Sequence, residues 1–143
     1  MDENRIKHSL AVSKKMIELN NGKNSEELFL ICYLHDIGYE FTTNMLEHNK
    51  IGGNILKENN FKYWKEIYYH GEPQCEYKSD YLTLLNKADM MVDNVGNDVG
   101  YLNRLENIKS RYGEESIQYI KAKQLIGELC SNYRFKIDMS QIH

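Results

Sequence analysis

Apolar residues recur three or four positions apart along almost the whole chain, and this spacing constrains the fold more than any other feature of the sequence. Residues at that spacing lie on one face of an α-helix, so the pattern predicts helices that each bury one side. The chain contains a single proline, Pro73, so long stretches can stay helical without a break. The sequence therefore predicts an all-α fold, in the form of a single compact helical bundle.

The first predicted helix ends at the Asn-Asn-Gly sequence of residues 20–22, which is typical of a helix terminus. Its buried side is expected to run through Ile6, Leu10, Ser13 and Ile17. His8, Val12 and Leu19 are expected close to this side.

An uninterrupted run of seven apolar residues predicts that the second helix is buried. Asn24 and Glu27 have the spacing of a capping box at its start, and Gly38 marks its end. By this interpretation His35 and Asp36 lie in the last turn of the helix.

Five further helices are predicted after the second. They cover residues 46–59, 61–71, 79–92, 102–113 and 114–133. His48 and Asp89 fall on the buried stripes of the first and third of these. The Asp-, Asn- and Gly-rich residues 93–100 predict a loop. We expect one domain over residues 1–133, followed by a tail, residues 134–143, that is extended or forms a short edge strand.

The chain has 143 residues, enough to bury about two-thirds of its unfolded surface without help from a metal or a disulfide. Its three cysteines are far apart and form no C-x-x-C pair, which argues against a disulfide framework and a thiolate zinc site. This cysteine usage favours a reducing, cytoplasmic location. No apolar run approaches the ~20 residues of a membrane span.

The formal net charge of −3 argues against a general nucleic-acid-binding protein, which normally carries a basic face. An anionic small molecule stays open as a substrate if positive charge gathers locally, and a bound metal would supply that charge.

Four histidines and two aspartates fall on predicted buried stripes or at helix ends. They are His8, His35, Asp36, His48, His70 and Asp89. Burying a carboxylate costs several kcal/mol unless a partner compensates its charge, and the sequence shows no lysine or arginine paired with either aspartate. A metal centre would compensate both. Imidazole and carboxylate ligands without cysteine favour a divalent transition metal such as Fe, Mn, Co, Ni or Zn.

The adjacent pair His35 and Asp36 favours two ions rather than one. Neighbouring residues on a helix point about 100° apart, so the two side chains would not ordinarily reach one point. Two ions ~3.5–4 Å apart would allow the histidine to bind one ion while the aspartate bridges both.

The order and spacing of these six residues resemble those of the HD-domain superfamily of metal-dependent phosphohydrolases. Residues 35–38, His-Asp-Ile-Gly, match the HDIG form of the superfamily's motif. The resemblance covers roughly residues 4–92. It implies an all-α HD domain and a binuclear metal site.

The resemblance also implies a role for each ligand. The first metal would be held by His8, His35, Asp36 and Asp89. The second would be held by His48 and His70, with Asp36 as the bridging and catalytic residue. In such centres a metal-bridging water of lowered pKa attacks phosphorus, which implies a small phosphorylated, nucleotide-like substrate.

Within the superfamily, the small size of the chain and its Tyr69-His70 and Ala88-Asp89 dipeptides are most similar to the bacterial HD-type diadenosine tetraphosphate hydrolases. One departure concerns Tyr39, because many HDIG proteins have a phosphate-contacting lysine at this place. The sequence after His70 also lacks the HD-GYP signature of cyclic di-GMP phosphodiesterases. No acidic pair follows the HDIG motif, unlike in guanosine tetraphosphate hydrolases.

Two alternatives to a hydrolase remain open. Di-iron oxygenases of the HD superfamily use the same ligand shell, and O₂ chemistry needs the same N/O ligands and an open coordination position. A helical module with a structural or sensory metal is the other alternative, motivated by the missing lysine. The sequence leaves the oligomeric state undecided, and a homodimer is compatible with the hydrolase, the oxygenase and the non-catalytic module.

Outside the ligand set, Lys87 and Arg104 are the candidates for contacting substrate phosphate, and Arg111 is a further one. Arginine suits bidentate phosphate binding, although a surface salt bridge is the more common role for such residues.

Overall fold

The computed structural model describes residues 2–42 and 45–131, and the predicted C-terminal tail lies outside these residues. The described part contains seven α-helices and two short 3₁₀-helices, η1 and η2. They are, in chain order, α1 Glu3–Leu19, α2 Ser25–Leu34, η1 Ile37–Glu40, η2 Met45–Glu47, α3 His48–Glu58, α4 Trp64–Tyr69, α5 Asp80–Asp89, α6 Gly100–Tyr112 and α7 Ile117–Ser131. No described helix is long and apolar enough to cross a membrane.

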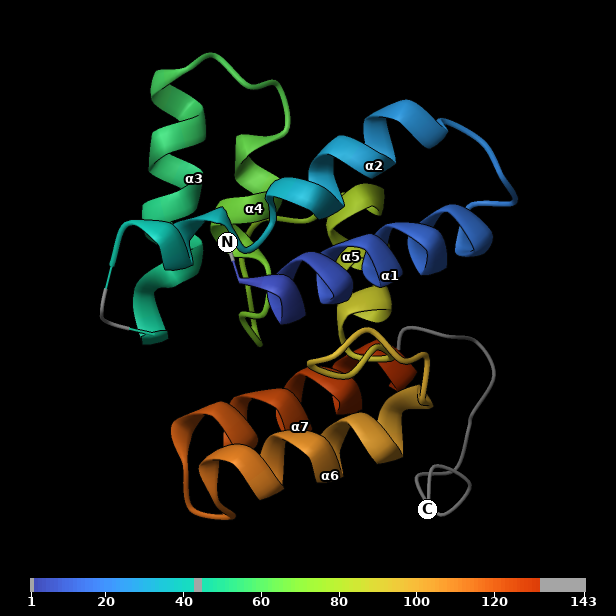
Figure 1. The fold of residues 1–143 in the computed structure, drawn as a ribbon, viewed down its shortest axis with the longest axis vertical. Coiled ribbons are helices and arrows are strands. Elements are labelled where there is room, and N and C mark those ends of the chain that lie inside the picture. Colours follow the sequence, from blue (N-terminus) through green and yellow to red (C-terminus); the bar gives the residue numbers. More distant parts are fainter. Residues whose placement is uncertain (1, 43–44, 132–143) are drawn as a thin grey trace.

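The helices form two groups, which Figure 1 shows one above the other. Helices α1–α5 form a bundle in which α1 packs on α2 and α5, and α3 packs on α4. Helices α6 and α7 pack on each other as a hairpin below the bundle. The loop that leads into the hairpin is closed by an isolated antiparallel bridge between Val92 and Asp98.

Each group has its own hydrophobic core. The core of the bundle is centred on Met16, Ile31 and Ile67, which are fully buried. The core of the hairpin is centred on Ile126 and includes Met90, the residue that directly follows α5. The two cores therefore approach each other near the end of α5. Buried polar residues, Asp89 among them, lie at this place.

The predicted all-α fold is confirmed, and the five later helices begin and end within three residues of their predicted bounds. Helix α5 shows why such local signals work. Its N-cap Ser79 accepts a hydrogen bond from the Leu82 N–H at 2.9 Å, which satisfies a donor that the first turn of a helix leaves free.

The predicted buried side of the first helix is correct in part. Ser13 is buried, as are its predicted neighbours His8 and Val12, but Leu10 is 43% exposed. The buried face runs through His8, Val12, Ser13 and Met16. The face is set by what α1 contacts on α2 and α5, and a polar site belongs to that interface, so the apolar stripe alone misplaces it.

The predicted start of the second helix is confirmed, because Asn24 is its N-cap residue, but the predicted capping box and the predicted end are wrong. Asn24 has a left-handed conformation, and its side-chain oxygen accepts no capping hydrogen bond from the first turn. Its amide nitrogen donates to the Tyr81 hydroxyl at 2.8 Å. The helix ends at Leu34, so His35 and Asp36 follow it rather than lying in its last turn. Two of its apolar residues, Phe29 and Leu30, are exposed, so α2 is buried on one side only.

Candidate metal centre

Six side chains from separate elements meet where α1, α2, α3, α4 and α5 converge. They are His8 from α1, His35 and Asp36 after α2, His48 at the start of α3, His70 after α4 and Asp89 at the end of α5. We refer to them as the His-Asp cluster. Five of the six are buried, and the His48 side chain is 18% exposed. The structure therefore brings together every metal ligand that the sequence predicts.

Asp36 lies at the centre of the cluster, and its two carboxylate oxygens face different histidines. Oδ2 lies 3.2 Å from His35 Nε2 and 3.7 Å from His8 Nε2. Oδ1 lies 3.2 Å from His48 Nε2 and 3.5 Å from His70 Nε2. One carboxylate is thus shared between two pairs of imidazoles.

Asp89 completes the side of the cluster that contains His8 and His35. Its Oδ1 lies 2.8 Å from His8 Nε2 and 3.4 Å from His35 Nε2. The Arg104 guanidinium approaches the same oxygen at 3.9 Å and donates to the Asp89 carbonyl at 3.1 Å. The sequence did not reveal this pairing, because 15 positions separate the two residues.

Main-chain carbonyls hold three of the imidazoles in one orientation. The carbonyls of Cys32 and Ile67 accept from Nδ1 of His35 and His70, and the Asp93 carbonyl accepts from Nδ1 of His8 at 2.8 Å. Since a carbonyl can only accept, each Nδ1 carries the proton. In the neutral imidazole this leaves Nε2 with a free lone pair directed at the cluster, as a metal ligand requires.

The donor set fits a divalent cation. The Nε2 lone pairs and carboxylate oxygens that face one another are all acceptors, and only positive charge satisfies them together. The buried His35 Nε2 has no hydrogen-bond partner, and a bound cation would give this nitrogen one. Two groups of ligand atoms lie close enough to hold an ion: His8, His35 and Asp89, and His35, Asp36 and His70.

The pKa values of the cluster show how strongly its charges depend on one another. Burial lowers the pKa of His35, but the negative charges of Asp36 and Asp89 beside its Nε2 raise it well above its ordinary value. Burial raises the pKa of both aspartates, but their histidine partners hold it well below the usual range. The carboxylates therefore stay ionised and need a proton or a metal cation as counter-charge.

The glycine after the His-Asp pair, Gly38, is needed for close packing between two elements. It does not end the second helix, as the sequence predicted, because α2 already ends at Leu34. A Cβ atom at this position would lie 1.7 Å from the His48 carbonyl oxygen and 2.9 Å from the Gly52 nitrogen. Only glycine lets η1 approach the first turn of α3 so closely. This approach brings His48 to the Asp36 carboxylate.

A cavity of about 280 Å³ opens on the His-Asp cluster and extends between the bundle and the hairpin. This volume is close to the lower end of the range of small-molecule sites, about 300–1,000 Å³. On the hairpin side, α6 contributes Arg104, Ile108, Arg111 and Tyr112, and α7 contributes Gln118, Lys121, Ala122 and Leu125. Both sets follow helical spacing, so each helix turns one face to the cavity.

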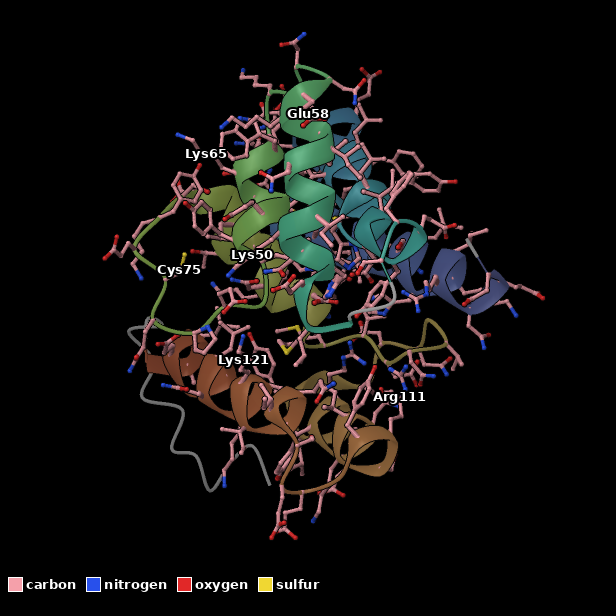
Figure 2. The ribbon with its side chains drawn as sticks, turned by 90° about the vertical axis from the view of Figure 1, so that its left-hand side faces the viewer. Lys50, Glu58, Lys65, Cys75, Arg111 and Lys121 are labelled. Carbon is pink, nitrogen blue, oxygen red and sulfur yellow. The ribbon has the colours of Figure 1, made fainter. Side chains whose placement is uncertain are left out.

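The three residues predicted to contact phosphate differ in their position relative to the cavity. Lys87 does not line the cavity. Arg104 lines it but is only 7% exposed. Its Nε donates to the Asp89 carbonyl at 3.1 Å, so it is a buried link between hairpin and bundle rather than a surface residue. Arg111 is exposed in the cavity wall, 4.9 Å from the Tyr112 ring. In Figure 2 Arg111 lies on α6 and Lys121 on α7, both toward the side of the hairpin that faces α3.

Two residues of the site were missed by sequence reasoning, Arg5 and Tyr39. The Arg5 guanidinium stacks on the Tyr39 ring, which in turn stacks on His48. A signal for Arg5 was present, because it precedes His8 by three positions and so lies on the same side of α1. Tyr39 was noted only as a departure from the HDIG pattern, and its stacking could not be predicted because its partners come from two other helices.

Comparison with known protein families identifies the family of the bundle. The family model described as HD domain matches residues 5–91. The matched segment contains the whole His-Asp cluster and ends before the hairpin. No curated protein and no solved structure matches the chain.

Proposed function

The chain belongs to the HD domain family, and on this premise we propose that it is a metal-dependent phosphohydrolase that cleaves a nucleotide-like phosphate ester or anhydride. The observation that carries the proposal is the division of the Asp36 carboxylate. One oxygen faces His8 and His35, and the other faces His48 and His70. A carboxylate arranged in this way suits two ions, one on each side.

In this proposal the first ion is held by His8, His35, Asp36 and Asp89. The second is held by His48 and His70, with Asp36 shared. Two divalent ions bound there would lower the pKa of a water molecule to give a nucleophile near neutral pH and would neutralise charge on the phosphate. The ions belong to the Fe, Mn, Co, Ni and Zn group that nitrogen and oxygen ligands favour.

The chain's own residues orient the site and shape the substrate cavity. The carbonyls of Cys32, Ile67 and Asp93 keep three imidazoles turned toward the cluster, so little reorganisation is needed when a cation binds. The hairpin wall combines apolar side chains such as Ile108 and Leu125 with cationic ones, a mixture that suits an organic group joined to phosphate. This supports a nucleotide-like substrate, with diadenosine tetraphosphate as the first compound to test.

The test combines metal analysis with a substrate screen. Protein purified without chelator is assayed for bound transition metals, then loaded with Mn²⁺ or Fe²⁺ and incubated with nucleoside mono-, di- and triphosphates, diadenosine tetraphosphate and an activated phosphodiester. We expect about two ions per chain and phosphate release from at least one substrate. A loaded protein that hydrolyses none of them would contradict the proposal, and oxygen consumption with reduced iron would replace it with oxygenase chemistry.

A further inference from the structure

Arg5 is fixed beside the His-Asp cluster by a stack of three side chains. Its guanidinium carbon lies 3.6 Å from the centre of the Tyr39 ring. The Tyr39 ring lies 3.9 Å from the His48 ring, and the two planes are 9° apart. The Tyr39 ring thus links the guanidinium to His48 of the cluster, and all three residues line the cavity.

The charge of Arg5 is poorly satisfied within the protein. Its Nη1 is buried and has no hydrogen-bond partner. Its one ion-pair partner in the described part of the chain is Asp2, at 3.4 Å from Nε, and the Asp2 side chain is 65% exposed, so water screens this pair. A buried donor without a partner costs about 1–3 kcal/mol. A ligand that accepts from Nη1 would remove this cost.

The geometry points to a phosphate-oxygen subsite at Arg5, and we propose that this subsite takes the place of the lysine that is absent after Gly38. The proposal rests on the proposed phosphohydrolase function. Ring stacking occupies a face of the guanidinium, and Nε donates to Asp2 Oδ2 at 3.4 Å. This leaves the planar edge formed by Nη1 and Nη2, which matches two phosphate oxygens. Tyr39, which stands where the lysine would be, positions Arg5 instead of contacting phosphate.

The test measures binding of inorganic phosphate to the Mn²⁺-loaded full chain by calorimetry. Arg5→Gln is expected to weaken binding roughly 10- to 100-fold, because a hydrogen bond to a charged group is lost. Arg5→Lys keeps the charge but not the planar edge, so we expect partial recovery. Lys14→Gln removes a positive charge from the exposed side of the same helix, away from the cavity, and should bind phosphate as the unchanged protein does.

Manganese content and melting temperature are measured for every variant. If the stack only supports His48, the Arg5→Gln protein should bind less manganese or melt at a lower temperature than the unchanged protein. That result would overturn the subsite. Phosphate binding within twofold of the unchanged protein would also overturn it, as would failure of the unchanged protein to bind phosphate at millimolar concentration.

The proposed function and the subsite fail separately. A loaded protein that binds phosphate through Arg5 but hydrolyses no substrate supports the subsite and contradicts the hydrolase. Conversely, hydrolysis with the same kcat and KM in Arg5→Gln keeps the hydrolase and overturns the subsite.

Discussion

The bundle and the hairpin bury their side chains in different ways. The bundle surrounds the five buried residues of the His-Asp cluster. Three main-chain carbonyls accept hydrogen bonds from the imidazoles of this cluster. The hairpin has a mostly apolar core and leaves Ile117 and Ile120 exposed. Arg104 is a buried link between the two regions.

The difference indicates how the two regions divide the work of the site. In the bundle, the buried charges of the His-Asp cluster are stable only with matching partners, so the contacts around the cluster leave little room for other side chains. The hairpin contributes a wall of the cavity and no residue of the His-Asp cluster. The match to the HD domain family covers the bundle and stops before the hairpin, in agreement with this division.

Loss of the shared carboxylate should have the largest effect. We expect Asp36→Ala to lower kcat by more than ~10³-fold, which exceeds the roughly 10²–10³-fold loss from removing a single electrostatic donor. Metal content should fall as well, while circular dichroism still shows a helical protein, because the apolar cores remain. Asp36→Asn, which keeps the shape but not the charge, should behave similarly. Near-normal rates with two bound ions in either variant would rule out the bridging role.

Gly38→Ala should be the most damaging change of a residue that binds no metal. The new methyl group would overlap the His48 carbonyl, and relief requires η1 and α3 to separate. We expect a loss of about 3 kcal/mol or more in the free energy of unfolding, at or beyond the upper end of overpacking effects. Metal content should also fall, because His48 moves from Asp36. Urea unfolding and metal analysis measure both effects, and an unchanged metal content would show that the close approach does not position the ligand.

Adding metal should stabilise the bundle more than the hairpin. Manganese at 100 times its dissociation constant would raise the free energy of unfolding by about 2.7 kcal/mol if only the folded state binds it. Hydrogen exchange measured with and without manganese should show the larger gain in protection in α1–α5, where all the ligands lie. Equal gains in α6 and α7 would mean that the two regions unfold as one unit.

The smallest expected effect is a gain in stability from Gly127→Ala in the hairpin. Within residues 2–42 and 45–131, a Cβ atom at Gly127 meets no other atom within 4 Å, and the residue lies inside α7. Alanine should therefore raise the free energy of unfolding by about 0.5–1 kcal/mol, because glycine loses more backbone entropy in a helix. Metal content and kcat should not change. A destabilised variant would show that α7 packs more tightly than the structure indicates.

The sequence by itself determined the helical architecture and the membership of the His-Asp cluster. Helix starts such as Ser79 and the helical spacing of apolar residues are local signals, which persist whatever the rest of the chain does. The ligands were predictable for a related reason. Charged residues at buried positions, such as Asp36 and Asp89, need compensation, and that need is visible before the partners are known.

Only the tertiary structure decided how these residues are used. The face of α1 that is buried, the oxygen of Asp36 that meets each histidine and the stack of Arg5 on Tyr39 all depend on contacts between separate elements. The role of Gly38 is of the same kind, because its neighbour is the carbonyl of His48 on another helix. Helical spacing specifies which residues share a side of one helix, whereas packing between helices sets the distances between sides, and these distances come from the whole fold.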